Sequence, residues 1–241
     1  MSLAGGPLPM HPPVRHRSTR DRPAKAPLSE DAVVDAALAI LRSGGLEAVT
    51  MRRVAGALDT GPASLYVYVS GREGLLQAML DRVTATIELE APDPSRWRAQ
   101  LHSLLQRTHQ ALVAHPGIAA MTLADPPTTE AVLLLTENLL GILLAGGLDP
   151  QGAAWACDIF VLLVTAAARA DDVRCPRGRS DDGDRREQVD KLYKTFASLP
   201  PDRFPLIAAH AAQMVAGDGD ERFRFAIDVV VDGVVARAAR Q

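Results

Sequence analysis

Apolar residues recur along most of this chain at the three- and four-residue spacing of an amphipathic α-helix. Capping residues, Gly and Pro divide the pattern into segments: Ser29 precedes the first apolar stripe, and Gly44-Gly45 follows it. No stretch shows the sustained period of two that indicates a half-buried strand. The pattern therefore predicts an all-α protein, with helices over residues 30–43, 51–58, 62–69, 72–90, 95–115, 128–145, 151–170, 187–197, 201–216 and 221–240.

Two polar stretches interrupt these helices. Residues 1–27 are rich in Pro and Gly and carry five basic residues against one acid, so we expect a disordered basic arm that either stays solvated or adds contacts to DNA. Residues 171–186 are charged and contain Gly and Pro, which predicts a surface loop. The remaining pattern divides into a head with a connector helix over residues 28–90 and a helical body over residues 91–241.

Composition and charge fit a small head on a larger helical body. Hydrophobic residues make up 47% of the chain but aromatic residues only 4%, which favours helices packed on helices over a β-sandwich. The net charge is −3, but residues 1–82 carry +2 and the rest carries −5. A mildly basic N-terminal part on an acidic body is compatible with DNA binding through the head.

The clearest motif lies between Thr50 and Leu76. Thr50 can cap a short helix, Asp59-Thr60-Gly61 breaks the helical pattern, and Pro62 suits the first position of a new helix because it lacks an N–H. Two short helices joined by a tight turn form a helix-turn-helix, whose second helix can enter the DNA major groove. Ser70 and Glu73 then have the spacing of a capping box that would start the connector helix.

This motif resembles the tetracycline-repressor (TetR) family of bacterial regulators. The resemblance rests on Thr50, Arg52, Arg53, Ala55, Leu58, Pro62-Ala63-Ser64-Leu65-Tyr66, Tyr68, Arg72-Glu73 and Leu75-Leu76. The body resembles the C-terminal domain of the tetracycline repressors through Ala114-His115-Pro116-Gly117, Gly147-Leu148-Asp149-Pro150, Arg203-Phe204-Pro205 and the segment from Glu221 to Gly233. The resemblance implies an operator-binding head, a body with a ligand cavity, and two helices that pair with a second subunit.

The residues expected to touch DNA lie on or beside the two short helices. They are Arg52, Arg53, Pro62, Ala63, Ser64, Tyr66, Val67, Tyr68 and Arg72. The hydroxyls of Tyr66 and Tyr68 suit phosphate oxygens, as does Arg72. The resemblance implies that Arg52 can reach a base, and packing within the head is the alternative role for Tyr66. The face around Pro62 and Val67 is small and mostly apolar, so thymine contacts and DNA shape should matter most.

The resemblance also places an effector site in the body. Its expected residues are Leu101, Leu104, Thr108, Met121, Thr122, Asn138, Leu139 and Ile142, and the alternative for each is a plain core position. Asn138 is the strongest candidate because a buried amide needs a partner. Thr122 matches the His that holds the ligand's magnesium in the tetracycline-binding protein. We therefore expect no metal or cofactor, and an effector that is largely apolar and uncharged.

Two helices of the body are expected to form a homodimer. The apolar residues assigned to this interface are Trp155, Ile159, Leu163, Phe223, Ile227, Val230, Val231 and Val234. Those of the last helix nearly encircle it, and a helix this apolar must be covered. A second subunit is the simplest cover.

Other classes of function lack support in the sequence. No hydrolase, zincin or Walker motif is present, so we do not expect an enzyme. The apolar run over residues 131–148 is interrupted by Glu137-Asn138 and Gly146-Gly147, and no signal peptide is evident, so we expect a cytoplasmic protein without a membrane span. The sequence predicts a dimeric, ligand-responsive repressor of a near-palindromic operator. The alternative is a ligand-sequestering or protein-interaction module with a degenerate head.

Overall fold

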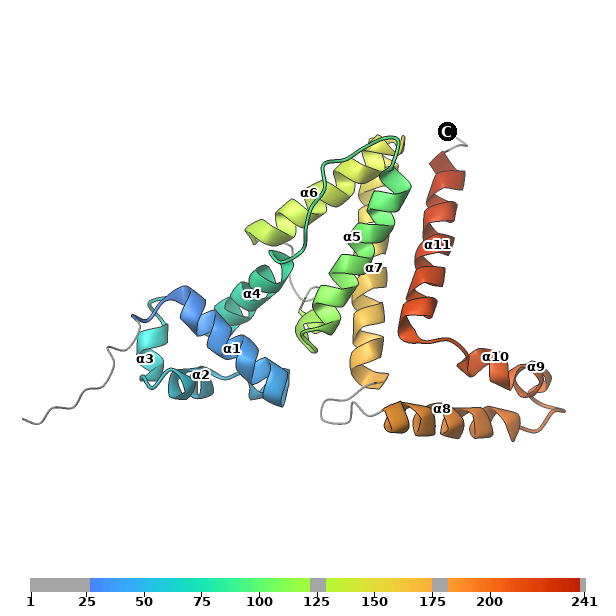
Figure 1. The fold of residues 1–241 in the computed structure, drawn as a ribbon, viewed down its shortest axis with the longest axis horizontal. Coiled ribbons are helices and arrows are strands. Elements are labelled where there is room, and N and C mark those ends of the chain that lie inside the picture. Colours follow the sequence, from blue (N-terminus) through green and yellow to red (C-terminus); the bar gives the residue numbers. More distant parts are fainter. Residues whose placement is uncertain (1–26, 122–128, 175–181, 239–241) are drawn as a thin grey trace, which may run out of the picture.

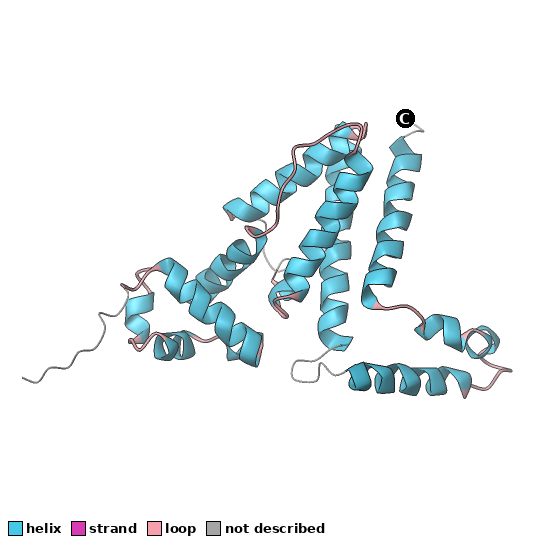
Figure 2. Ribbon diagram, viewed as in Figure 1, coloured by secondary structure: helices cyan, strands magenta, loops and turns pink. Residues whose placement is uncertain are grey.

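The computed structural model describes residues 27–121, 129–174 and 182–238, and within these ranges every regular element is a helix (Figure 2). The predicted basic arm lies outside the described residues. The helices are α1 (Glu30–Gly44), α2 (Met51–Ala57), α3 (Pro62–Leu65), α4 (Gly71–Thr84), α5 (Trp97–Val113), α6 (Glu130–Ala145), α7 (Pro150–Arg174), α8 (Asp182–Ala197), α9 (Pro205–Ala209), α10 (Ala211–Val215) and α11 (Gly219–Ala238). Two short 3₁₀ turns, η1 (Leu46–Ala48) and η2 (Ile118–Ala120), join some of them. The all-α prediction is confirmed.

The head consists of α1, α2 and α3, with α4 leading from it into the body (Figure 1). The predicted caps are present: the Ser29 hydroxyl accepts a hydrogen bond from the Ala32 N–H, and the Thr50 hydroxyl accepts one from the Arg53 N–H, both at 3.2 Å. Fully buried side chains, among them Leu41 and Leu65, hold the short helices together. Local capping and a shared core thus fix the helix-turn-helix.

The connector differs from its prediction at both ends. Ser70 precedes α4 but its side chain makes no capping hydrogen bond, so the expected capping box is absent. The helix ends at Thr84, six residues before the predicted Glu90. β-Branched residues crowd this end, and the Thr86 hydroxyl donates to the Val83 carbonyl at 2.6 Å in a turn that replaces the helix.

The body is built around α5, α6 and α7, with α11 packed on α5 and α7 (Figure 1). Phe223 of α11 is buried and stacks on the buried His109 of α5, with ring centroids 4.2 Å apart. Arg98 of α5 also pairs with Asp232 of α11 at 3.2 Å. These contacts attach the last helix to its own subunit.

Two predicted boundaries near the C-terminus were wrong. The loop predicted over residues 171–186 is shorter, because α7 continues to Arg174 and α8 already begins at Asp182. The helix predicted over 201–216 is divided into α9 and α10 at His210. Helices α8, α9 and α10 pack on one another, and α8 runs roughly crosswise to α7 and α11 (Figure 1).

Helix α7 is apolar on more than one face. By length and composition alone, its segment Pro150–Ala170 could cross a membrane. In the fold, Ala153, Phe160 and Val164 of this segment are buried in the core of the body. Part of the helix's apolar surface therefore belongs to ordinary core packing, and another part faces solvent in the single chain.

Candidate DNA-binding surface and effector cavity

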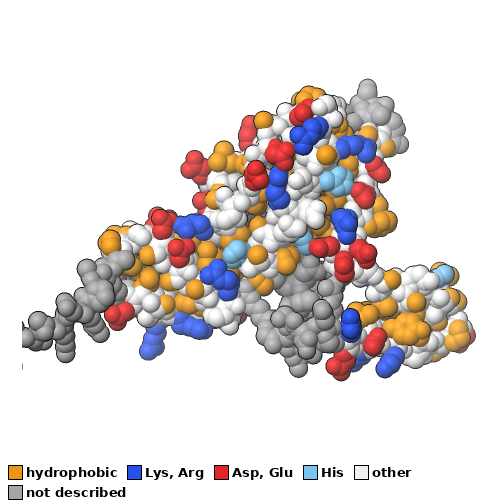
Figure 3. All heavy atoms as spheres, in the orientation of Figure 1, with side chains coloured by type: hydrophobic (Ala, Val, Ile, Leu, Met, Phe, Trp, Pro, Cys, Tyr) orange, Lys and Arg blue, Asp and Glu red, His pale blue; other side chains and the backbone are white. Residues whose placement is uncertain are grey.

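The predicted DNA-contacting residues form an exposed surface on α2, α3 and the turn after α3. Leu65 is fully buried and anchors this region, whereas Val67 is 80% exposed and Tyr66 is 60% exposed. Pro62, Ala63 and Ser64 are exposed beside them, and Arg52 and Arg53 are exposed on α2. Figure 3 shows Lys and Arg side chains projecting from the edge of the head where α2 lies. The exposed short helix and the basic side chains of Arg52 and Arg53 thus allow this surface to approach the DNA phosphates.

Two of the predicted contacts are partly used by the head itself. The Arg72 Nε donates to the Val49 carbonyl at 3.2 Å, and its Nη2 donates to the Leu46 carbonyl at 3.5 Å. Tyr68 is half-buried against the core of the head. Arg72 therefore has a structural role that the sequence did not reveal, because its partners lie more than twenty residues away. Phosphate contact by either residue stays a prediction.

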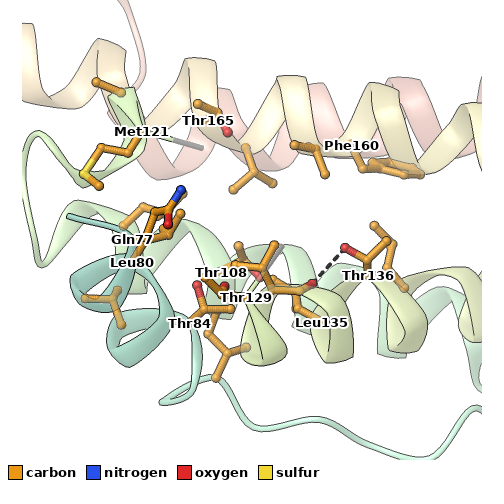
Figure 4. Close-up of a pocket in the computed structure, with 18 of the residues that line it drawn as sticks. Gln77, Leu80, Thr84, Thr108, Met121, Thr129, Leu135, Thr136, Phe160 and Thr165 are labelled. Atoms are coloured by element: carbon orange, nitrogen blue, oxygen red, sulfur yellow. Dashed lines mark hydrogen bonds between the residues drawn. The ribbon is translucent and has the colours of Figure 1, made fainter. Parts of the chain in front are cut away.

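A partly open cavity of about 370 Å³ lies between α4, α5, α6 and α7 (Figure 4). Its size is within the range of small-molecule sites. Most of its wall is apolar, with Leu80, Leu135 and Phe160 contributed by three different helices. The arrangement can exclude water from a ligand that is itself largely apolar.

Only part of the predicted ligand set lies in this wall. Leu104, Thr108, Met121 and Leu139 line the cavity, and their contact with a ligand stays a prediction. Leu101 and Ile142 are buried in the core of the body and are not among the residues that line the cavity, so the expectation that they face it is not met. Thr122 lies outside the described residues.

Asn138 is also absent from the cavity wall, which corrects the strongest single expectation. Its Nδ2 donates to the Glu90 carbonyl at 2.8 Å and so ties α6 to the segment that follows α4. Glu90 is held further by Arg107, whose Nη1 lies 3.1 Å from the Glu90 Oε1. The amide nitrogen of the half-buried Asn138 therefore has a backbone partner and not a ligand, whereas its Oδ1 is buried and has no hydrogen-bond partner among the described residues.

Several polar residues of the wall were missed. They are Glu73, Gln77 and Thr84 on α4, Thr129 and Thr136 at α6, and Thr165 on α7. A signal for Gln77 and Thr84 was present: together with Leu80 they follow helical spacing, so they share a face of a helix that was assigned only as a connector. Thr84, Thr108 and Thr129 all line the cavity, although they come from three separate segments (Figure 4).

The hydroxyls differ in how far the protein already uses them. Thr108 donates to the Leu104 carbonyl at 2.8 Å, and Thr136 donates to the Val132 carbonyl at 2.9 Å, so both retain lone pairs that can accept. The Thr129 hydroxyl is buried and has no hydrogen-bond partner within the described parts of the chain. A ligand oxygen or N–H at this point would satisfy it.

An apolar stripe on α7 faces solvent in the single chain. Trp155, Ile159 and Leu162 follow helical spacing and are 59%, 46% and 54% exposed. On α11, Phe225 and Val229 are 71% and 55% exposed. Exposed large apolar side chains on neighbouring helices are typical of an interaction site, and the predicted dimer interface on α7 stays a prediction.

The interface residues predicted for α11 need correction. Phe223, Ile227 and Val231 are at most 4% exposed and belong to the core of their own subunit. Val230 and Val234, and Leu163 on α7, are half-buried against the same core. The periodicity showed an apolar helix, but it could not show which of its faces the same chain covers.

No group of His, Cys, Asp and Glu residues suited to a metal ion occurs in the described ranges. Cys157 is buried in the core, and burial, with a smaller effect from Asp158, raises the pKa of its thiol to about 11. The cavity wall has hydroxyl, amide, carboxylate and apolar groups to offer a ligand.

A helix-turn-helix head that shares one helix with a cavity-containing body defines a class of protein: transcription regulators that respond to a small molecule. Two family descriptions match the chain, "Bacterial regulatory proteins, tetR family" over residues 33–79 and "Tetracyclin repressor-like, C-terminal domain" over residues 91–238. The chain belongs to the TetR family of bacterial transcription regulators, whose members bind operator DNA, respond to small molecules and form homodimers.

Relatives from Streptomyces agree with this assignment. The chain is 32% identical over 231 residues to the HTH-type transcriptional repressor DrrR1 of Streptomyces coeruleorubidus. The aligned region covers 92% of this chain and 84% of DrrR1. The crystal structure of apo ActR from Streptomyces coelicolor superposes with a TM-score of 0.80 at 31% identity, covering 90% of this chain and 99% of ActR. The crystal structure of ActR in complex with actinorhodin superposes with a TM-score of 0.79 at 33% identity, covering 88% of this chain and 97% of ActR.

Proposed function

We propose that this protein is a cytoplasmic, homodimeric repressor that leaves its operator when an oxygenated, largely apolar molecule enters the cavity. DrrR1 carries the name of a repressor, and ActR has been crystallised with actinorhodin and with (S)-DNPA. The same two functions, DNA binding and ligand binding, have separate candidate sites in this chain. No catalytic step is assigned to either.

The observation that carries this proposal is the double role of α4. One face of the helix lines the cavity through Gln77, Leu80 and Thr84. From the same helix, Arg82 forms ion pairs with two acids of α1, Asp31 and Asp35, the latter at 3.0 Å. A ligand that displaces α4 must therefore act on the head as well.

A second contact links α4 to the opposite cavity wall. The Asp81 Oδ1 accepts a hydrogen bond from the Ala131 N–H at 2.9 Å, in the first turn of α6. This carboxylate satisfies an N–H that has no partner within α6 and favourably faces the positive end of the helix. The orientation of α4 is consequently tied to α6 on one side and to α1 on the other.

The mechanism follows from the geometry of two tethered heads. A dimer binds two half-sites only when the separation of its heads matches the spacing of those sites on the DNA. If the protein binds the ligand more tightly when α4 has a different orientation, the ligand shifts the population toward that orientation, and the protein then releases DNA. The coupling is reciprocal, so operator DNA must weaken ligand binding by the same factor.

The cavity wall indicates the chemistry of the effector. Its apolar surface favours a ring system, and the threonine hydroxyls favour several oxygen substituents on that system. The unpartnered Thr129 hydroxyl gives one of those substituents a fixed place. No oxygen substituent needs to be charged to bind here.

The test begins with selection of bound sequences from random DNA by the full-length protein. Fluorescence anisotropy then measures whether actinorhodin and related oxygenated polycycles release the selected duplex. Thr136→Trp fills the cavity from α6 and should abolish release while leaving DNA affinity unchanged. Leu134→Trp adds the same bulk on the exposed face of α6 and should behave like the wild type.

Two results would contradict the proposal in different ways. If the Thr136→Trp protein releases DNA at the same ligand concentration as the wild type, the effector binds outside the cavity. Failure of the wild type to select any DNA, with ligand binding intact, would support the alternative of a ligand-sequestering module with a degenerate head.

A further inference from the structure

Glu73 is the only charged residue among the described residues that line the cavity. It lies in the first turn of α4, four residues before Gln77, so the two side chains share one face of the helix. Leu46 of η1, which belongs to the head, lines the cavity beside them. Figure 4 places Gln77 and Met121 at one end of the cavity and Thr136 and Phe160 at the other. Glu73 therefore belongs to the end that faces the head.

The local structure gives Glu73 no partner. The capping box that would have engaged it is absent, since Ser70 makes no side-chain capping hydrogen bond. No hydrogen bond or ion pair connects Glu73 to any other described residue. The neighbouring Arg72 donates to the backbone carbonyls of Leu46 and Val49 and forms no ion pair with Glu73.

Glu73 could serve only to stabilise the start of α4, because an acid in the first turn of a helix interacts favourably with the helix dipole. That role does not require its side chain to line a cavity. An ionised carboxylate offers only hydrogen-bond acceptors. The Glu73 carboxylate lies at the mouth of a cavity whose described wall holds no other charged residue. It therefore attracts a cation, and no basic residue of that wall weakens this attraction. Such a wall would favour a cation over an anion at this end.

We propose that the head-facing end of the cavity is a subsite for a protonated amine, carried at one end of an otherwise apolar, oxygenated effector and bound by Glu73. This inference rests on the proposed function and changes the expectation of an uncharged effector. The amine would neutralise a carboxylate on the first turn of α4, directly beside the head. Effectors with an anionic group at the same end would be rejected.

Three probes with one ring system test the subsite: 9-(aminomethyl)anthracene, 9-(hydroxymethyl)anthracene and anthracene-9-carboxylic acid. Anthracene fluorescence reports binding to the full-length protein. Because Glu73 is exposed at the cavity mouth, water screens the interaction, and we expect the amine to bind roughly threefold to tenfold more tightly than the alcohol. The carboxylic acid should bind most weakly.

Matched variants identify the group responsible. Glu73→Gln should remove the preference for the amine and leave the affinity for the alcohol unchanged. Glu73→Lys should invert the order so that the acid binds better than the amine. Glu47→Gln removes the same charge from the neighbour of Leu46, outside the cavity wall, and should keep the wild-type preference.

The outcomes separate the subsite from the proposed function. If the alcohol binds and Thr136→Trp blocks it, but the wild type binds amine and alcohol equally, the subsite is refuted and the cavity stands. A preference for the amine that persists in Glu73→Gln also refutes the subsite. If none of the probes binds, or if Thr136→Trp does not weaken them, the cavity itself is refuted and the subsite with it.

Discussion

Replacing Leu162 with Glu should separate the two subunits without unfolding either one. Leu162 lies on the exposed stripe of α7, and its side chain is 54% exposed in the single chain. A charge at this position meets water in the monomer, so the fold of the subunit is not disturbed. In the dimer, the same charge would enter an apolar interface.

The size of the effect follows from the exposed fraction. Complete burial of a Leu side chain is worth about 1.5–3 kcal/mol, so covering the exposed half contributes about 1 kcal/mol. A twofold interface contains the residue twice, and each desolvated carboxylate costs at least about 1 kcal/mol more. The dimer should lose about 4 kcal/mol, which corresponds to roughly a thousandfold rise in the dissociation constant.

Sedimentation velocity over nanomolar to micromolar concentrations measures the dissociation constant, and circular dichroism checks the helix content. Val231→Ala is the matched control on α11: Val231 is 1% exposed, so the change should cost about 2 kcal/mol of subunit stability and leave the dimer intact. A Leu162→Glu protein that stays dimeric with unchanged affinity would refute the assignment of this stripe to the interface. Operator affinity should fall with the dimer, because the heads are no longer tethered.

Three further predictions concern the head and the core. Arg52→Ala should cost about 1–3 kcal/mol on the selected operator but little on random DNA, measured by anisotropy, and an equal loss on both would contradict base reading. Arg72→Ala should lower the melting temperature of the head as well as DNA affinity, because its bond to the Val49 carbonyl is lost, and an unchanged melting temperature would contradict that role. In a Cys175→Ser background, native Cys157 should resist alkylation at pH 8. Because burial raises the pKa of the Cys157 thiol from 9.0 to about 11, its contribution to stability is complete below pH 9 and is lost as the pH rises toward 11, which denaturant titrations against pH can measure.

Several features of the protein that depend on neighbouring residues in the chain could be predicted from the sequence, although the capping box expected at Ser70 and Glu73 did not form. The caps at Ser29 and Thr50 form as predicted, because a cap joins groups only three residues apart. Asp149 likewise accepts hydrogen bonds from the Gln151 and Gly152 N–H groups at the start of α7. The helix-turn-helix follows from such local signals, and its residues Pro62 and Tyr66 carried the resemblance that the family matches confirm.

The tertiary structure decided which face of each apolar helix is covered and which polar groups meet. Val231 and Val229 are equally apolar, yet the first is buried by its own chain and the second is exposed. Asn138 finds its partner at Glu90, forty-eight residues away, and so lies outside the cavity that the sequence assigned to it. Periodicity describes one helix at a time, whereas burial and long-range hydrogen bonds depend on how several helices pack. For that reason the sequence alone determined the class of protein, and only the packed helices defined the wall of its cavity.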